Sequence, residues 1–201
     1  MLAHLRGGGE FGPDWWRSGQ LERRQNTFDD LYAVARALFA RGLTTARQLA
    51  VYGVSSGATI AAAVAVQRPD LFGAAIAQAP VTDMFALVRD PITHMIAKLE
   101  DGDPDDPAMS QILRTWSPYQ NVVDGTPYPA MLIDCDSNDP RCPTWHGRKL
   151  AARMQRATSS GRPVLLRVRT GAGRMAASEA DRRTQQTEML AFLADQLGLT
   201  I

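Results

Sequence analysis

The sequence has few cysteines, no excess charge of either sign and no long apolar run. The two cysteines, Cys135 and Cys142, are too few for a disulfide framework and lack the spacing of a zinc site, so we expect reduced thiols, a cytoplasmic location and no metal. Lys and Arg number 22 against 21 Asp and Glu, without a basic stripe, which disfavours nucleic acid as a partner. The N-terminus lacks the apolar core of a signal peptide, and no stretch reaches the roughly 18 apolar residues of a membrane span, so neither export nor a membrane association is expected.

Short apolar runs alternate with helical patterns along the 201 residues. The apolar runs are 2–5, 49–52, 74–77, 130–135 and 164–168, and the helical patterns run from a capping box at Thr27 and Asp30 to a stop at Gly42, and over 56–66, 143–156 and 180–197. Strands buried on both faces have this near-continuous apolar character. The alternation predicts one α/β domain over 1–201, a mostly parallel sheet flanked by helices, with residues 85–127 as an excursion over one sheet edge.

A G-x-S-x-G motif lies between the predicted strand 49–52 and the predicted helix 56–66. It reads Gly53-Val54-Ser55-Ser56-Gly57, the pattern of a tight elbow that holds a serine hydroxyl above the end of a sheet. In that setting the amide of Ser56, at the start of the helix, is placed to donate to an oxyanion. The alternative is a Gly/Ser turn that merely caps an ordinary helix.

A second glycine motif, GGGEFG, matches the dinucleotide-binding pattern G-x-G-x-x-G through Gly7, Gly9 and Gly12. The last glycine of that pattern opens a helix packed closely on the preceding strand. Here Pro13 and two tryptophans follow it. The surrounding residues therefore disfavour a dinucleotide site, and no cofactor is expected.

A cluster of acidic residues follows the predicted strand 130–135. Asp139 comes 84 residues after Ser55, in the chain order of an α/β-hydrolase, where an acid after a later strand orients the base. Asp134 and Asp136 are alternatives for this role. A further alternative is that the cluster forms an Asx turn capping the helix that begins near Pro143.

Ordered motifs over nearly the whole chain resemble the catalytic domain of the prolyl oligopeptidase family of serine peptidases. They are LRGGGEFGPDWWRSG, NTFDDL, GVSSGA, RPDLFGAAIAQAPVTDM, SPYQNV, NDPRCPTWHGRKLAARMQ and a GAG near the C-terminus. The resemblance implies an α/β-hydrolase fold, a peptide substrate and acyl-enzyme chemistry. It also implies Ser55 as nucleophile, Asp139 as triad acid and Arg141 facing the bound peptide.

The resemblance also implies parts that this sequence is expected to lack. Members of the family carry a propeller domain and first hydrolase strands before RGGGEFG, whereas this chain begins at Met1. An incomplete sheet of this kind exposes an edge strand, which favours self-association or complementation by another chain. The family's proline-stacking tryptophan falls near Ile96, so proline specificity is not expected.

The expected triad histidine is replaced. Aligning the loop after the last predicted strand puts that histidine at Arg174 or, in another register, at Thr170. A guanidinium stays protonated and cannot accept a proton from serine, so an alternative role for Arg174 is an ion pair with Asp139.

The chain has three histidines, His4, His94 and His146. Each is more readily explained as a surface or core residue than as a base, with His94 in the excursion the nearest alternative. The sequence therefore predicts a weak or inactive serine peptidase. The alternative is a non-catalytic, truncated remnant or binding module of the same fold.

Overall fold

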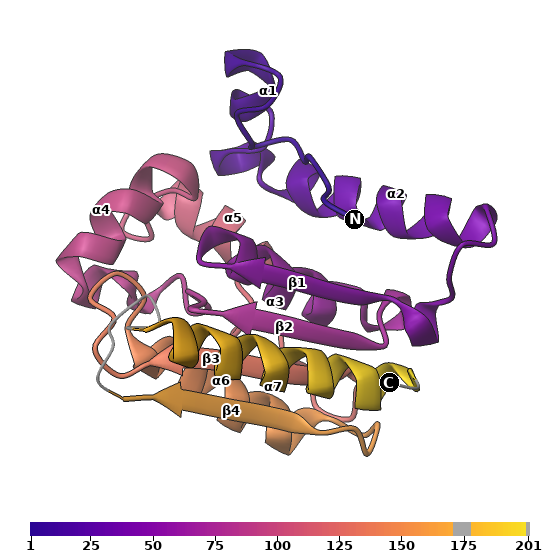
Figure 1. Ribbon diagram of the computed structural model, residues 1–201. Coiled ribbons are helices and arrows are strands. Elements are labelled where there is room, and N and C mark those ends of the chain that lie inside the picture. The colour runs from indigo at the N-terminus through magenta and orange to yellow at the C-terminus, as the bar shows by residue number, and fades with distance from the viewer. Residues whose placement is uncertain (171–177, 200–201) are drawn as a thin grey trace.

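A computed structural model, which describes residues 1–170 and 178–199, consists of a four-stranded parallel sheet between helices (Figure 1). The strands lie in the order β1 (Ala50–Val54), β2 (Ala74–Gln78), β3 (Ala130–Asp136) and β4 (Val164–Arg169). All three neighbouring pairs are parallel. The predicted parallel α/β sheet is confirmed, and four of the five predicted strands are present.

Seven α-helices and four short 3-10 turns complete the described part of the chain. The helices are α1 (Pro13–Arg17), α2 (Gln25–Ala40), α3 (Ser56–Gln67), α4 (Pro91–Glu100), α5 (Pro107–Trp116), α6 (Thr144–Ala157) and α7 (Glu179–Leu197). The turns are η1 (Leu21–Arg23), η2 (Ala46–Gln48), η3 (Pro69–Leu71) and η4 (Ala86–Arg89). None of the helices seen in residues 1–170 and 178–199 combines the length and the apolar character needed to cross a membrane.

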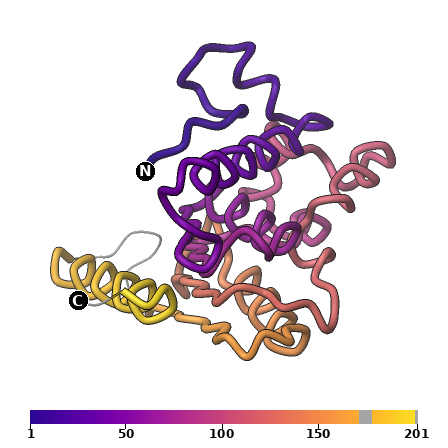
Figure 2. The backbone as a smooth tube through the Cα atoms, turned by 90° about the vertical axis from the view of Figure 1, so that its right-hand side faces the viewer, coloured from indigo at the N-terminus to yellow at the C-terminus, as the bar shows by residue number. Residues whose placement is uncertain are grey.

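The core has two layers, one on each face of the sheet. Because successive strand residues point to opposite faces, Ala75 and Ala77 pack in the layer that holds α3 and α6, while Ala74 and Ile76 pack with Phe192 of α7. Figure 2 shows α7 set apart from α2, on the other side of the sheet. The central strands β2 and β3, covered on both faces, are apolar at nearly every position, which is why their short runs could be found in the sequence.

The predicted strand over residues 2–5 is wrong. Residues 1–5 form no regular element, and Leu2 is 80% exposed. The carbonyl of Leu5 accepts hydrogen bonds from Gly8 N–H and from the indole of Trp15, so this end of the segment is fixed by a turn rather than by a strand partner.

The predicted start of α2 is also wrong, although its stop is confirmed. The helix begins at Gln25, before Thr27, and the hydroxyl of Thr27 donates to the carbonyl of Arg6 instead of capping the helix. Asp30 binds the guanidinium of Arg6. Gly42 follows the end of the helix with φ +66°, a backbone conformation that favours glycine.

The excursion over residues 85–127 contains η4, α4 and α5. Figure 1 shows α4 and α5 beside the carboxyl ends of the strands, toward which the strand arrows point. In an open parallel sheet, ligand sites form outside these strand ends. The excursion thus lies where it can form one wall of a site.

Candidate functional site

Ser55 occupies a strained turn between β1 and α3. Its φ of +59° and ψ of −120° lie in a region that residues with a side chain seldom adopt. The turn is fixed on both sides, because Ser55 N–H donates to the carbonyl of Gln78 at 2.8 Å and its own carbonyl accepts from Ala58 N–H at 2.9 Å. The predicted strand, turn and helix around the serine are confirmed.

The first glycine of the motif allows this turn to form. A Cβ atom on Gly53 would lie 2.0 Å from the carbonyl oxygen of Gly57, in the first turn of α3. A Cβ on Gly57 would meet no atom within 4 Å. Close contact between strand and helix therefore requires glycine at position 53 and not at position 57.

Ser56 is the first residue of α3. The first N–H groups of a helix have no partner within the helix and point to where an anion can bind. The Ser56 hydroxyl accepts a hydrogen bond from Arg24 Nη2 at 3.3 Å. The start of α3 therefore combines backbone donors with a side-chain contact that holds it in place.

A cavity of about 60 Å³ opens beside Ser55. Ser55, Ser56 and Arg141 all line it, so the structure brings three of the predicted site residues together. The opposite wall includes Ile96 of α4. The sequence analysis missed Cys142, which lines the same cavity with its sulfur 3.9 Å from Ser55 Oγ.

Asp139 lies in the loop that carries Arg141 and Cys142. One carboxylate oxygen accepts hydrogen bonds from Arg141 N–H at 2.8 Å and Cys142 N–H at 3.0 Å. The side chain is buried, and its other oxygen, Oδ2, has no hydrogen-bond partner among the described residues. A buried carboxylate oxygen without a donor is costly, which makes it a position where a further donor fits.

The two competing acids make other contacts. Asp134 accepts a hydrogen bond from Gln185 of α7 and lies 3.5 Å from Arg169 Nε; burial raises the pKa of its carboxyl. Asp136 accepts from Asn138 N–H at 2.9 Å. Neither carboxylate accepts from Arg141 or Cys142, which line the cavity, as Asp139 does.

His146 is a buried structural residue. Its Nδ1 accepts hydrogen bonds from the N–H groups of Thr82 and Asp83, each at 3.3 Å, and burial lowers its pKa to about 3. A ring whose nitrogen accepts two amide protons stays neutral and is no base for Ser55.

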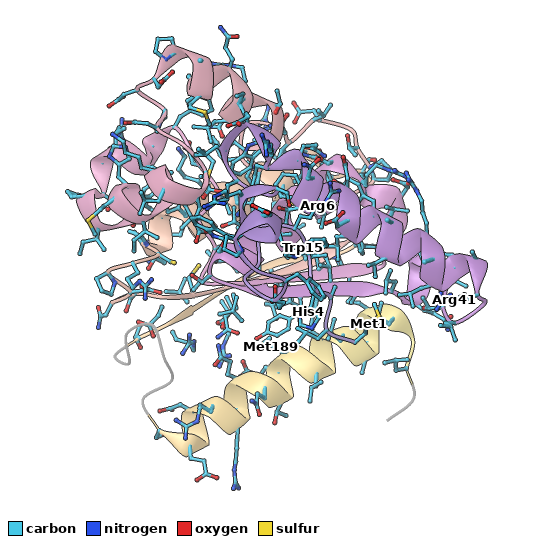
Figure 3. The ribbon with its side chains drawn as sticks, turned by 90° about the horizontal axis from the view of Figure 1, so that it is seen from above. Met1, His4, Arg6, Trp15, Arg41 and Met189 are labelled. Atoms are coloured by element: carbon cyan, nitrogen blue, oxygen red, sulfur yellow. The ribbon has the colours of Figure 1, made fainter. Side chains whose placement is uncertain are left out.

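The other two histidines pair with acidic side chains. His94 Nε2 lies 3.1 Å from Asp103, and His4 Nδ1 lies 3.2 Å from Glu10. Figure 3 shows His4 on the N-terminal segment, well apart from the pink helices of the excursion. Within the described residues, the hydrogen bonds of all three histidines thus go to partners other than Ser55.

The two positions predicted for the triad histidine lie at the edge of the described structure. Arg174 falls outside the described residues, and Thr170, an exposed residue after β4, is the last one before them. The described residues do not include the position at which the histidine is replaced, so the role of Arg174 stays a prediction.

The surroundings of the second glycine motif differ from a dinucleotide site. No strand precedes Gly7 within the described residues, and the helix after Gly12 has only five residues. Phosphate binding by this pattern needs a strand before it and a helix whose N-terminus faces the ligand.

No group of three or more His, Cys, Asp or Glu side chains suited to a metal occurs in the part of the chain that is described.

Comparisons with known proteins agree on one family. The profile of the prolyl oligopeptidase family matches residues 1–200. An uncharacterized peptidase, y4nA, of Sinorhizobium fredii is 39% identical over 151 residues, 75% of this chain and 21% of the relative. The prolyl endopeptidase of Elizabethkingia miricola is 29% identical over 199 residues, 98% of this chain and 28% of the relative.

Solved structures agree with these relatives. A prolyl endopeptidase structure superposes with a TM-score of 0.94 at 32% identity, covering 98% of this chain and 29% of that one. Oligopeptidase B from Leishmania major gives 0.92 at 30% identity, covering 99% and 28%. Prolyl oligopeptidase B from Galerina marginata, bound to a 35mer substrate, gives 0.90 at 28% identity, covering 98% and 28%. The chain thus spans less than a third of the relatives it matches.

Proposed function

Because this chain belongs to the prolyl oligopeptidase family of serine peptidases, we propose that Ser55 is the nucleophile of an acyl-enzyme reaction on peptides. One observation carries the proposal: Ser55 is held at φ +59° at the start of α3, beside a cavity that Arg141 also lines. Strain of this kind is kept where the surrounding structure and a function require it.

Each site residue is assigned a role in the proposed reaction. Ser55 Oγ attacks the scissile carbonyl and loses its proton to a base; the Ser56 N–H donates to the oxygen that becomes negative. Collapse of the adduct breaks the C–N bond, the amine leaves with that proton, and water then hydrolyses the ester. Asp139, whose Oδ2 has no described partner, is placed to orient a base at that oxygen, and Arg141 faces the peptide.

We propose that this chain is a poor catalyst because the base is missing. The described histidines have other partners, and Arg174 stands where the family's histidine is expected. Loss of the triad base lowers the turnover of serine peptidases by several orders of magnitude. The same replacement favours a second function, a module that binds peptides without cleaving them.

Labelling with a fluorophosphonate probe, with the adduct located by mass spectrometry, tests the assignment. We expect slow or no labelling of the wild type, faster labelling of Arg174→His, and none when Ser55→Ala is added. Wild-type labelling as fast as that of Arg174→His would overturn the missing-base reading. Labelling of neither would overturn the nucleophile assignment and favour the binding module.

We further propose that copies of this chain associate at the free edge of β1. Among the described strands, β1 is paired on one side only. Its Tyr52 and Val54 side chains are 53% and 44% exposed, and unpaired apolar edges promote association. Sedimentation velocity would show a concentration-dependent larger species that Val54→Lys abolishes; a monomer at all concentrations would contradict this.

The reaction is proposed to take place in the cytoplasm. Cys135 and Cys142 are both buried, and burial raises the pKa of the Cys135 thiol to about 12, so the thiolate form of Cys135, which disulfide exchange needs, is scarce. Fractionation of cells that make this protein tests the location, and recovery outside the cytoplasmic fraction would contradict it.

A further inference from the structure

A buried ion pair joins two distant parts of the chain next to the cavity at Ser55. Arg24 is 3% exposed and Asp101 is 7% exposed, with Arg24 Nε 3.0 Å from Asp101 Oδ1. Burying both charges is costly, and such a pair seldom stabilises a fold more than apolar residues of the same size would. The presence of this buried pair is therefore better explained by the position in which it holds its two segments than by a gain in the stability of the fold.

The guanidinium of Arg24 also contacts the start of α3. Its Nη2 donates to Ser56 Oγ at 3.3 Å, while Nη1 donates to the carbonyl of Gly19 at 3.5 Å. The guanidinium carbon lies 6.0 Å from the centre of the Trp116 ring. One planar group with five donors thus contacts both Ser56, the residue after Ser55, and Asp101.

Asp101 caps the C-terminal end of α4, the helix that forms a wall of the cavity. Besides the local pairs of His94 and Lys98 with Asp103, two side-chain contacts tie α4 to the chain around Arg141. The Trp145 indole donates to the Asp90 carboxylate at 3.0 Å, and Thr93 Oγ1 donates to the carbonyl of Arg141 at 2.9 Å. The contact with Arg24 is an ion pair to a residue distant in sequence, and it lies at the end of α4 farthest from Asp90.

We propose that Arg24 is a positioning residue: paired with Asp101, it holds α4 as the wall of the cavity and holds Ser56 at the start of α3. The consequence for catalysis rests on the proposed function of Ser55. Without the guanidinium, Asp101 is buried with no cation, so the end of α4 moves toward water. The cavity then opens and Ser56 loses its side-chain donor.

Cysteine alkylation reports this opening without any need for activity. Cys142 lines the cavity and is 4% exposed, whereas Cys135 is buried in β3 and becomes reactive only when the whole domain unfolds. With iodoacetamide and mass spectrometry, we expect Arg24→Gln and Asp101→Asn each to raise the alkylation rate of Cys142 about tenfold, as for local opening, and to leave Cys135 unchanged. Either variant alone suffices if the other does not fold.

A matched control removes an ion pair elsewhere. Arg6→Gln breaks the pair with Asp30, 2.5 Å long in the N-terminal region, and should leave the Cys142 rate as in the wild type. An unchanged Cys142 rate in a folded Arg24→Gln or Asp101→Asn protein, or an equal increase in Arg6→Gln, would overturn the proposal.

A conservative substitution separates the two contacts of Arg24. In Arg24→Lys the ammonium still pairs with Asp101 but has no second nitrogen for Ser56, so the Cys142 rate stays near wild type. In the Arg174→His background, fluorophosphonate labelling of Ser55 should nevertheless fall about tenfold. Unchanged labelling would refute the contact with Ser56. If no variant labels at all, the proposed nucleophile fails, and the thiol rates still decide whether Arg24 holds α4.

Discussion

Gly53→Ala tests whether the turn at Ser55 depends on close contact between β1 and α3. The new Cβ would lie 2.0 Å from Gly57 O, 2.2 Å from Gly57 C and 2.8 Å from Ala58 N, all backbone atoms. To reach an ordinary contact of 3.4 Å from that oxygen, the helix and strand must separate by about 1.4 Å, the difference between 3.4 and 2.0 Å. The hydrogen bond from Ser55 N–H to Gln78 O resists this, so we expect a loss of about 3 kcal/mol, the upper part of the range for overpacking.

Gly57→Ala is the matched control in the same motif. Its Cβ meets nothing within 4 Å, and alanine is favoured over glycine in a helix by up to about 1 kcal/mol, so we expect no loss or a gain of about 0.5 kcal/mol. Urea denaturation followed by circular dichroism gives both free energies of unfolding. Equal costs for the two variants, or a cost below about 1 kcal/mol for Gly53→Ala, would refute the reasoning.

Two further predictions concern the buried groups around α6. The pKa of His146 is lowered to about 3, so the unfolded chain, with an ordinary value of 6.5, binds more protons; the free energy of unfolding should fall by about 1.4 kcal/mol per pH unit between pH 6 and 4. His146→Gln should flatten that slope in urea titrations, and an unchanged slope would contradict the assignment. Lys149→Met removes the cation that helps keep the Asp83 pKa low, and should lower the free energy of unfolding by about 2 kcal/mol at pH 7. This is less than the loss on breaking a fully buried ion pair, because Lys149 is partly exposed. Because a lowered Asp83 pKa stabilises only above its unfolded value, this cost should shrink below about pH 4, and an equal cost at pH 7 and pH 3 would exclude the ion pair as its source.

The sheet could be predicted from the sequence because its central strands, β2 and β3, are covered on both faces. Residues 74–77 and 130–135 are apolar at nearly every position, and this pattern is local. Residues 2–5 are also mostly apolar, but a strand needs a partner backbone as well, which no local pattern contains. The predicted start of α2 was wrong for a similar reason. Thr27 and Asp30 form the pattern of a helix cap, yet both bind Arg6, which is distant in sequence.

The residues of the candidate site likewise divide into those that the sequence predicts and those that only the fold brings together. Ser55 and Ser56 were predicted because strand, turn and helix follow one another within a short stretch. Asp139 was predicted because it follows a later apolar strand in the chain order of an α/β-hydrolase. Arg24 and Asp101 are 77 residues apart, so no spacing indicates that they meet. Cys142 was noted only as a thiol, because its position beside Ser55 comes from the packing of two loops.

The unpartnered oxygen of Asp139 gives a way to tell a triad acid from a structural one. In Asp139→Asn the amide oxygen can keep the bonds from Arg141 N–H and Cys142 N–H, while a neutral NH₂ replaces the buried charged Oδ2. If Oδ2 has no donor, removing its charge should raise the free energy of unfolding by about 1 kcal/mol. If Arg174 pairs with it instead, the variant should lose about 1 kcal/mol or more, and Arg174→Met should lose a similar amount that is not additive with the first. Urea denaturation of the two single variants and the double variant separates these outcomes. Suppose that Asp139→Asn raises the free energy of unfolding and also abolishes probe labelling when it is added to Arg174→His. The carboxylate would then be a triad acid, kept to orient a histidine at a cost in stability. A lower free energy of unfolding in Asp139→Asn would instead make the carboxylate one half of an ion pair.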